Sequence, residues 1–487
     1  MKRNICLIAP PRYEKEVDAF LPQNLGLGYI AANLEKAGNV VTIIDALALG
    51  WERRRRIKEN GLFLRGLSID EILKRLPNDV EFVGIAGQFI TSKKVVIYIA
   101  SLIKNKFPKV LTVIGGISPS INPFDFIDDV SVDFVVQGPG EIAMVELVSG
   151  KCLSEIKGLV FKNKEGVSDN IQGEIPDDLD SLPFPARYLL PMEKYLALSG
   201  RGRSDLRTAS LLTSRGCPFD CTFCSVHHIF GYKWRSRSPK NIIEEIQMLI
   251  DEYDVQHIEF EDDNLTLNAR RAEEIFDGIA NLEKKITWST PNGIRIDTLS
   301  KDLLIKMKKS GCSSLSLSIE SGDPEILKIM NKQLDLKKVE EVVRICGDLS
   351  INTNGIFIVG YLGETAKSFE KTIKYIKRLR KIGLIGVSAS IAKAYPGTKL
   401  RRMCEENNSL VDKERYSCCK AIGEYVDIKT SYFTEREIFE RLYYIRKKLN
   451  PIRYYSDLFF ITKIIKIILP QWFIDLIKKR IYLLFKT

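Results

Sequence analysis

Short apolar runs alternate with amphipathic segments through the first third of the chain. The segments at 25–37 and 95–107 repeat their hydrophobic residues every three or four positions, which is typical of helices. Runs that fit buried strands lie at 4–9, 40–44, 82–86, 110–114 and 134–136. Five strands separated by helices predict an α/β fold with a doubly wound, Rossmann-like parallel sheet over residues 1–150.

The alternation resumes after residue 205. Strands are predicted at 210–213, 258–261, 287–290, 314–319, 355–359 and 386–391, each followed by a helical segment. Six such units predict a partial (β/α)6 TIM barrel over residues 205–404, with its chemistry at the carboxyl ends of the strands. The intervening residues, 151–204, lose the periodicity and carry several prolines, among them Pro183 and Pro185, so we expect a proline-rich linker there.

The pattern becomes helical from 405 to 487. The last thirty residues are apolar and basic, but no apolar run reaches the roughly 18 residues of a spanning helix. Two amphipathic helices at a membrane surface would explain this composition. Helices packed on the barrel or on a partner subunit would explain it equally well.

The net charge and the cysteine content bear on the expected binding partners and on the expected cellular compartment. A net charge of +11 would allow binding to anionic substrates, a membrane surface or nucleic acid, but it says nothing about the fold. Among partners, we expect no nucleic acid. Ten cysteines in 487 residues are too dilute for a disulfide framework, and no signal-peptide pattern precedes the first strand. We therefore expect a cytoplasmic protein, with peripheral contact to the inner face of the membrane through the C-terminal helices as an option.

Three cysteines lie within eight residues in a C-x-x-x-C-x-x-C motif: Cys217, Cys221 and Cys224. Cysteine thiolates are the usual ligands of iron-sulfur clusters, and three of them would leave one iron of a 4Fe-4S cluster open. Gly216 and Pro218 favour a sharply bent loop. A zinc site would need a further C-x-x-C or histidine pair, which the sequence lacks, and a disulfide with a spare thiol fits less well.

This motif, including Phe223 before the last cysteine, resembles that of the radical SAM superfamily, in which the open iron binds S-adenosylmethionine (SAM). The resemblance implies that acidic residues at the end of the second barrel strand contact the amino group of SAM and that residues after later strands reach its ribose, methionine and adenine portions. The side chains it assigns to SAM are Phe223, Glu261, Asp262, Arg295, Ser318, Glu320 and Tyr361. His227 and His228, close to the motif, suit catalysis and structure equally.

Glycines and polar residues follow the strands of the first domain, at the edge where doubly wound sheets bind ligands. None of the glycines forms the dinucleotide fingerprint G-x-G-x-x-G. The set resembles the cobalamin-binding domain that precedes the radical SAM core in one large subfamily. The residues so assigned to cobalamin are Asp45, Gly87, Gln88, Gly115, Gly116, Ser118, Gly138, Gly140 and Glu141.

One departure from methionine-synthase-type cobalamin domains concerns cobalt coordination. Those domains carry D-x-H-x-x-G, whose histidine is the lower cobalt ligand, whereas the three histidines of this chain, at 227, 228 and 257, lie outside the first domain. We therefore expect no histidine of that domain below the cobalt. Many members of the subfamily also lack this histidine.

The resemblance covers roughly residues 1–400 and implies a cobalamin-dependent radical SAM enzyme with a 4Fe-4S cluster, SAM and cobalamin. In this family the reduced cluster cleaves SAM to methionine and a 5′-deoxyadenosyl radical, and methylcobalamin commonly delivers a methyl group to the substrate. We expect methylation of an unactivated carbon, or of phosphorus, in a small molecule, with flavodoxin or ferredoxin as electron donor. The C-terminal tail alone suggests that the substrate is apolar.

Two other functions remain open at this point. A radical cyclase or rearrangement enzyme would use the same two domains without net methyl transfer, and a membrane-associated cobalamin or redox sensor would use them without catalysis. A methylthiotransferase would need a second cysteine trio in the first domain, where only Cys6 and Cys152 occur. The motifs do not name the substrate, because many chemistries share this fold and these cofactors.

Overall fold

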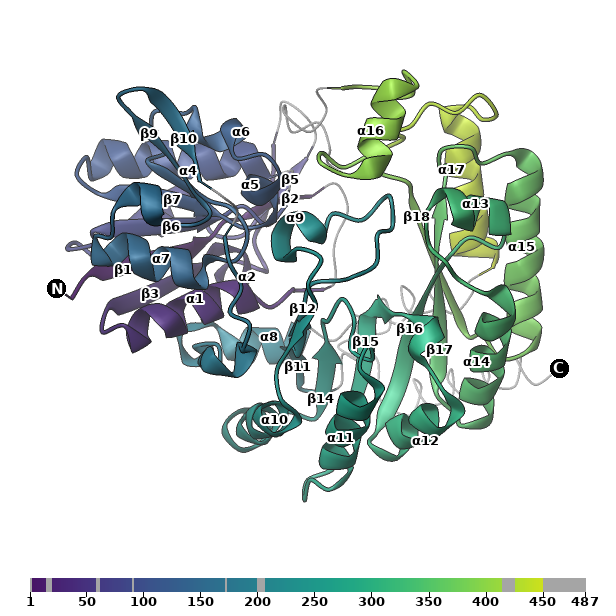
Figure 1. The fold of residues 1–487 in the computed structure, drawn as a ribbon. Helices are drawn as coiled ribbons and strands as arrows, with labels where there is room; N and C mark the ends of the chain where they lie inside the picture. Colours follow the sequence, from purple (N-terminus) through teal and green to yellow (C-terminus); the bar gives the residue numbers. More distant parts are fainter. Residues whose placement is uncertain are drawn as a thin grey trace, which may run out of the picture.

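The computed structural model describes residues 2–14, 20–57, 62–89, 92–170, 173–198, 206–413 and 425–449. Within these ranges the chain forms two helix-covered parallel sheets, the first purple to blue and the second teal to green in Figure 1. The two halves meet where α8 (Met192–Leu198) packs on β11 (Thr208–Leu211) and where α5 (Ile117–Ile121) contacts α9 (His227–Phe230). This confirms the predicted α/β fold class.

The first sheet has seven strands in the order β10-β9-β8-β7-β6-β1-β3. The five strands from β8 to β3 are parallel, and their order is that of a flavodoxin-like doubly wound sheet. They match the five predicted strands closely. The bounds of the seven strands are β1 (Asn4–Ala9), β3 (Val40–Asp45), β6 (Phe82–Ala86), β7 (Leu111–Gly115), β8 (Phe134–Val136), β9 (Leu159–Asn163) and β10 (Gly166–Asp169).

Helices cover both faces of this sheet. On one face α1 (Leu25–Lys36) packs beside α7 (Gly140–Ser149), and their apolar residues share a core with Ile5 and Leu7 of β1. The opposite face carries α3 (Ile69–Arg75), α4 (Lys93–Lys106) and α6 (Phe124–Ile127). Buried apolar residues on both faces explain why the parallel strands are nearly continuous hydrophobic runs.

Two features of this half were not predicted. The hairpin β9–β10 lies within residues 151–204, expected as a linker, and extends the first sheet through antiparallel pairing of β9 with β8. A separate three-stranded sheet combines β2 (Arg12–Glu14), β4 (Arg54–Arg56) and β5 (Phe63–Arg65). Strands this short carry too few residues to show a period of two, so the sequence pattern could not indicate them.

The second sheet has six parallel strands in sequential order, as predicted for a partial barrel. Its strands are β11 (Thr208–Leu211), β14 (His257–Phe260), β15 (Thr287–Ile294), β16 (Cys312–Glu320), β17 (Asn352–Val359) and β18 (Gly386–Ile391). The outer helices are α10 (Pro239–Tyr253), α11 (Ala269–Ala280), α12 (Lys301–Lys309), α13 (Pro324–Ile329), α14 (Leu336–Asp348) and α15 (Ala366–Lys381).

The alternation along β16 shows which side of the barrel is polar. Leu315, Leu317 and Ile319 are fully buried in the core shared with the outer helices. Ser314, Ser316 and Ser318 alternate with them and are half-buried, so they face the inside of the barrel. On β14, His257 contacts the hydroxyls of Thr287 (2.7 Å) and Ser289 (2.9 Å). The barrel is therefore polar inside.

The described part of the C-terminal region contains helices joined by non-helical segments, which include an isolated bridge between Leu410 and Ile428. Beyond α16 (Lys399–Glu406), α17 (Glu435–Tyr443) and a π-helical turn (Tyr444–Lys448) pack against β17 and β18. The predicted amphipathic segment at 458–485 lies outside the described residues. Among the helices that are described, none has the length and hydropathy needed to cross a membrane.

Candidate active site

A short antiparallel ribbon holds the base of the cysteine loop. β12 (Ser214–Arg215) pairs with β13 (Arg235–Ser236), so the chain leaves the barrel and returns beside its starting point. Gly216 follows with a φ of 87°, and a Cβ there would lie 2.4 Å from the carbonyl oxygen of Lys233. Only glycine can occupy this position without displacing the ribbon.

The loop itself is fixed by backbone hydrogen bonds to distant parts of the barrel. The Thr222 N–H donates to the Met330 carbonyl (3.0 Å), and the Leu400 N–H donates to the Thr222 carbonyl (2.7 Å). Asn331 donates through Nδ2 to the carbonyl of Asp220 (2.9 Å). These contacts come from segments that follow β16 and β18, and they hold the cysteines at the carboxyl ends of the strands.

The three cysteines are half-buried free thiols. Burial raises the pKa of each thiol, that of Cys224 to about 12, so ionised sulfurs in this loop need a positively charged partner. No three His, Cys, Asp or Glu side chains of the described ranges are close enough together to hold a single metal ion. In a 4Fe-4S cluster each cysteine binds a different iron, so three thiolates of one loop can hold three of its four irons.

The acidic stretch at the end of β14 divides its roles differently from the prediction. Asp262, predicted to contact SAM, is buried and accepts hydrogen bonds from the Thr213 hydroxyl (2.6 Å) and the Ser214 hydroxyl (2.6 Å). Glu261 accepts from Ser210 Oγ (3.1 Å) and from Asn292 Nδ2 (2.5 Å). Both carboxylates thus have partners within the barrel.

Asp263, which is not among the residues assigned to SAM from the sequence, is the exposed carboxylate of residues 261–263. Its carboxylate accepts a hydrogen bond from the Gly216 N–H. That bond places Asp263 beside the start of the cysteine loop. Three acidic residues in a row signal a site, but not which of them faces the loop.

Two cationic side chains lie next to the cysteine loop. The Arg295 guanidinium stacks on the Phe219 ring, 3.4 Å from its centroid. Lys332 forms a buried ion pair with Glu320 (3.0 Å), and its positive charge lowers the pKa of Cys221, which burial as the larger effect raises. Glu320 has a φ of 66°, a strained conformation that its surroundings maintain. Lys332 was not predicted, because it lies in a loop far from any motif.

Tyr361 contacts two residues of the cysteine loop. It is fully buried, its hydroxyl is hydrogen-bonded to that of Thr222, and its ring meets Phe223 edge-on at 6.4 Å. The structure thus brings Phe223 and Tyr361 together, and Tyr361 packs against the cysteine loop. Phe223 also lines a hollow of about 280 Å³ together with residues from the ends of β17 and β18: Ile358, Ser390, Ile391, Ala392, Lys393 and Tyr395.

The predicted cobalamin edge is built from closely packed backbone. Gly87 donates to the Gly115 carbonyl (2.7 Å), and Ser118 donates back to the Gly87 carbonyl (2.9 Å). A Cβ on Gly87 would lie 2.8 Å from Pro119 Cδ, and one on Gly116 would lie 3.2 Å from the Gly87 backbone. Glycine at 87 and 116 therefore allows the segments after β6 and β7 to pack closely against each other at the carboxyl ends of these strands.

Asp45 does not face this edge openly. It is 1% exposed, caps α2 (Ala46–Leu49) by accepting from the Ala48 N–H (2.8 Å), and accepts hydrogen bonds from Asn24 and Tyr195. Gln88 reaches the same cluster, donating to Asn24 Oδ1 (2.6 Å). Asp45 thus fixes the side chains around it and the start of α2, and does not itself line the edge.

The Gly138–Glu141 turn at the same edge connects the two halves. Gly138 (φ 77°) donates to Ser120 Oγ (2.8 Å), and Gly140 begins α7, where a Cβ would lie 3.0 Å from Ile30. Glu141, the next residue, forms a buried ion pair with Arg215 (2.7 Å), directly before the cysteine loop. The carboxylate of Glu141 therefore ties the first sheet to the loop.

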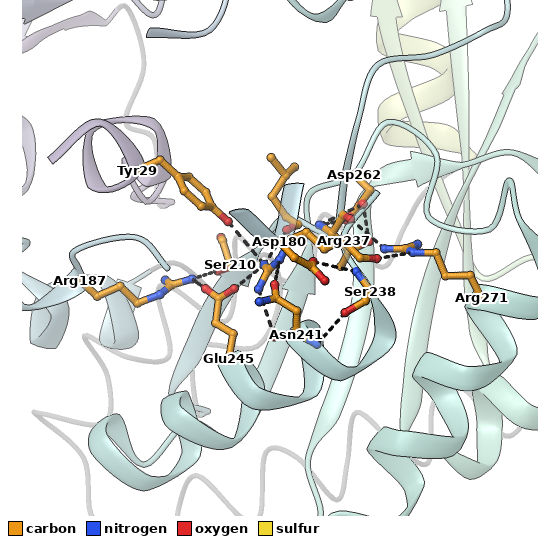
Figure 2. A network of polar contacts seen from close by, with 12 residues as sticks. Tyr29, Asp180, Arg187, Ser210, Arg237, Ser238, Asn241, Glu245, Asp262 and Arg271 are labelled. Atoms are coloured by element: carbon orange, nitrogen blue, oxygen red, sulfur yellow. Dashed lines mark hydrogen bonds and ion pairs between the residues drawn. The ribbon is translucent and has the colours of Figure 1, made fainter. Parts of the chain in front are cut away.

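A second buried network links Tyr29 of α1 and Arg187 to α10 of the second half (Figure 2). Arg187 and Arg237 converge on the fully buried carboxylate of Glu245, at 2.8 Å and 2.5 Å. Arg187 also binds the Ser210 carbonyl of β11 (2.9 Å), and Arg237 approaches the Tyr29 hydroxyl of α1 (3.5 Å). The predicted cobalamin edge and the cysteine loop are thus held in one arrangement.

Comparisons with known proteins agree with these two halves. Residues 17–148 match the model of the B12 binding domain, and residues 211–376 match that of the radical SAM superfamily. An uncharacterized methyltransferase of Pyrococcus horikoshii is 32% identical over 93% of this chain and 94% of its own length. Cytidylyl-2-hydroxyethylphosphonate methyltransferase of Streptomyces wedmorensis is 30% identical over 78% of this chain and 77% of its own.

Among solved structures, the radical SAM methyltransferase TsrM from Kitasatospora setae, with cobalamin and a 4Fe-4S cluster bound, has the same fold. It aligns with a TM-score of 0.63 at 17% identity and covers 84% of this chain and 75% of that chain. The two domain matches, the full-length relative and the cysteine loop place this chain in the family of cobalamin-dependent radical SAM enzymes of the methyltransferase type, with a 4Fe-4S cluster, SAM and cobalamin as its cofactors.

Proposed function

We propose that this enzyme methylates a small molecule that carries hydrogen-bonding groups, at a carbon or phosphorus atom held between the two halves. The observation that supports this most is the buried Arg215–Glu141 ion pair, which fixes the predicted cobalamin edge against the cysteine loop. When bound, the cluster supplies the electron that cleaves SAM, and cobalamin carries the methyl group. The protein's own contribution is to position these groups and to exclude water.

Three parts of the site suit the parts of SAM. The Asp263 carboxylate beside the loop would accept hydrogen bonds from the SAM ammonium, a charge-assisted contact. Lys332, balanced by Glu320, would face the SAM carboxylate. The hollow lined by Phe223 and Ile358 offers an apolar wall for the adenine. These assignments add Asp263 and Lys332 to the side chains predicted from the sequence to contact SAM; the contacts of Asp262 and Tyr361 with SAM stay a prediction.

The interior of the barrel favours a polar substrate over the apolar one expected from the tail. Ser314, Ser316 and Ser318 line it, with His257 and the hydroxyls of Thr287 and Ser289 nearby. Burying an apolar molecule against Ser314, Ser316 and Ser318 would desolvate their hydroxyls without providing partners, at a cost of about 1–3 kcal/mol for each unsatisfied group. A substrate with hydroxyl, phosphonate or amide groups would satisfy them instead.

The proposal includes the electron donor, the cellular location and the membrane contact that were expected from the sequence. A flavodoxin or ferredoxin in the cytosol would deliver the electron, since the cluster must be reduced before each cleavage of SAM. Peripheral membrane contact rests on residues 458–485 alone. Flotation of the protein with vesicles of anionic lipid, compared with a chain truncated at 449, tests that contact.

The methyl transfer is tested with SAM labelled by deuterium in its methyl group. The anaerobically reconstituted protein is incubated with reductant and a polar metabolite extract, with cytidylyl-2-hydroxyethylphosphonate as a defined probe. We expect a product that gains the labelled methyl group and is absent with Cys221→Ala. A product formed together with 5′-deoxyadenosine but without the label would identify a cyclase or rearrangement enzyme, and would contradict methylation.

A further inference from the structure

A buried asparagine at the end of β14 points its side chain at one cysteine of the loop. Asn264 is 3% exposed, and its Nδ2 lies 2.9 Å from the sulfur of Cys217. A metal-bound thiolate carries no hydrogen, so only the amide NH2 group can face it, as a donor. This contact joins residues 47 positions apart in the sequence.

The asparagine is held in place from its backbone. Its carbonyl oxygen accepts from the Trp234 indole Nε1 (3.1 Å) and from the Ser214 hydroxyl (3.3 Å). Ser214 and Trp234 stand on the two sides of the cysteine loop, next to Arg215 and Arg235, the paired residues of β12 and β13. The ribbon that carries Cys217 therefore also positions the amide that contacts it, and the two move as one unit.

We propose that Asn264 is a positioning residue that sets the reduction potential of the cluster by donating a hydrogen bond to the sulfur of Cys217. This rests on the proposed function, in that Cys217 must be a cluster ligand. Reduction adds one negative charge to the cluster and its sulfurs. A donor that is already oriented toward a sulfur stabilises the reduced form more than the oxidised form, and so raises the potential.

The expected size follows from the strength of such a contact. A hydrogen bond to a charged group is among the stronger ones in a protein. We expect removal of the donor to lower the equilibrium constant for reduction about tenfold, which corresponds to about 59 mV for one electron.

The test is a potentiometric titration, followed by electron paramagnetic resonance, of the anaerobically reconstituted full-length protein. The variants are Asn264→Leu and Asn264→Ala, both of which lack the donor. The matched control is Asn163→Leu, which removes an exposed asparagine of β9 that contacts Ser168 instead. Circular dichroism and iron content establish that each variant is folded and loaded.

We expect the midpoint potential of Asn264→Leu and of Asn264→Ala to lie below that of wild type, with Asn163→Leu equal to wild type. Loaded Asn264 variants that titrate at the wild-type potential would overturn the inference and leave the proposed function intact. If Asn264→Leu does not load, Asn264→Ala decides between these outcomes. A wild-type protein that forms no cluster would instead remove the proposed function on which the inference rests.

Discussion

The carboxylate of Glu245 offers a direct test of how the two halves are joined. It lies on α10, is fully buried, and neutralises Arg187 and Arg237, whose side chains are themselves 1% and 5% exposed. The substitution Glu245→Gln keeps the shape of the side chain and removes its charge. Two buried guanidinium groups then lose their common counter-ion.

Breaking a buried ion pair by removing one partner costs about 3–5 kcal/mol. Because both arginines share one carboxylate and retain their backbone carbonyl acceptors, Ser210 and Leu212, we expect a loss of about 4 kcal/mol in the free energy of unfolding, within that range. With a urea dependence of about 3 kcal/mol per molar, the unfolding midpoint falls by about 1.3 M. Circular dichroism and tryptophan fluorescence in urea measure this shift.

The neighbouring residue supplies the control, and pH supplies a second check. Glu244→Gln removes a half-exposed carboxylate 3.9 Å from Lys240 and should change the stability by less than about 0.5 kcal/mol. Burial raises the pKa of Glu245, but the charges of Arg237 and Arg187 outweigh it and hold the pKa below its ordinary 4.5. The stabilisation is therefore complete above pH 4.5 and is lost as the pH falls through the lower pKa of the folded state. A Glu245→Gln variant as stable as wild type at pH 7 would refute this reasoning.

Two further substitutions test other parts of the account. Burial raises the pKa of Glu364 to about 7, so the folded protein keeps a proton that the unfolded chain releases above 4.5, and stability from this group falls as the pH rises through that window. Glu364→Gln should therefore be more stable than wild type at pH 8, by up to about 3 kcal/mol, and no more stable at pH 4.5; an equal difference at both pH values in urea titrations would contradict this. Gly216→Ala places a Cβ against Lys233 and forces a left-handed conformation costing about 1–2 kcal/mol, so we expect a folded protein with little iron after reconstitution, and full iron content would argue against the loop geometry.

Much of the fold was predictable because its strands and helices leave clear hydrophobic patterns in the sequence. Parallel strands covered on both faces are continuous apolar runs, and the helices between them keep a clear period, as in β6 and α4. The run Arg54–Arg56 shows where this fails. It gives no strand signal, yet it forms β4, where Arg54 pairs with Glu14 and stacks on the Phe63 ring. These partners are distant in sequence, so local patterns do not reveal them.

The site was predictable in position and not in detail. The cysteine spacing located the loop, and the strand ends located its surroundings. Which carboxylate of 261–263 remains open depends on Thr213, which binds Asp262 from the segment between β11 and β12. Lys332 and Asn264 reach the loop through folds of the chain that no motif records. Roles set by long-range partners require the structure.

The most direct test of the central claim is anaerobic reconstitution with iron, sulfide and hydroxocobalamin. The readouts are absorbance spectra of the bound cofactors and mass-spectrometric detection of 5′-deoxyadenosine, with Cys221→Ala as the control. We predict that one protein binds both cofactors and forms 5′-deoxyadenosine from SAM only when the cluster is present. Cleavage of SAM without bound cobalamin would contradict the account of the first half, and cofactor binding without 5′-deoxyadenosine would point to a sensor instead of an enzyme.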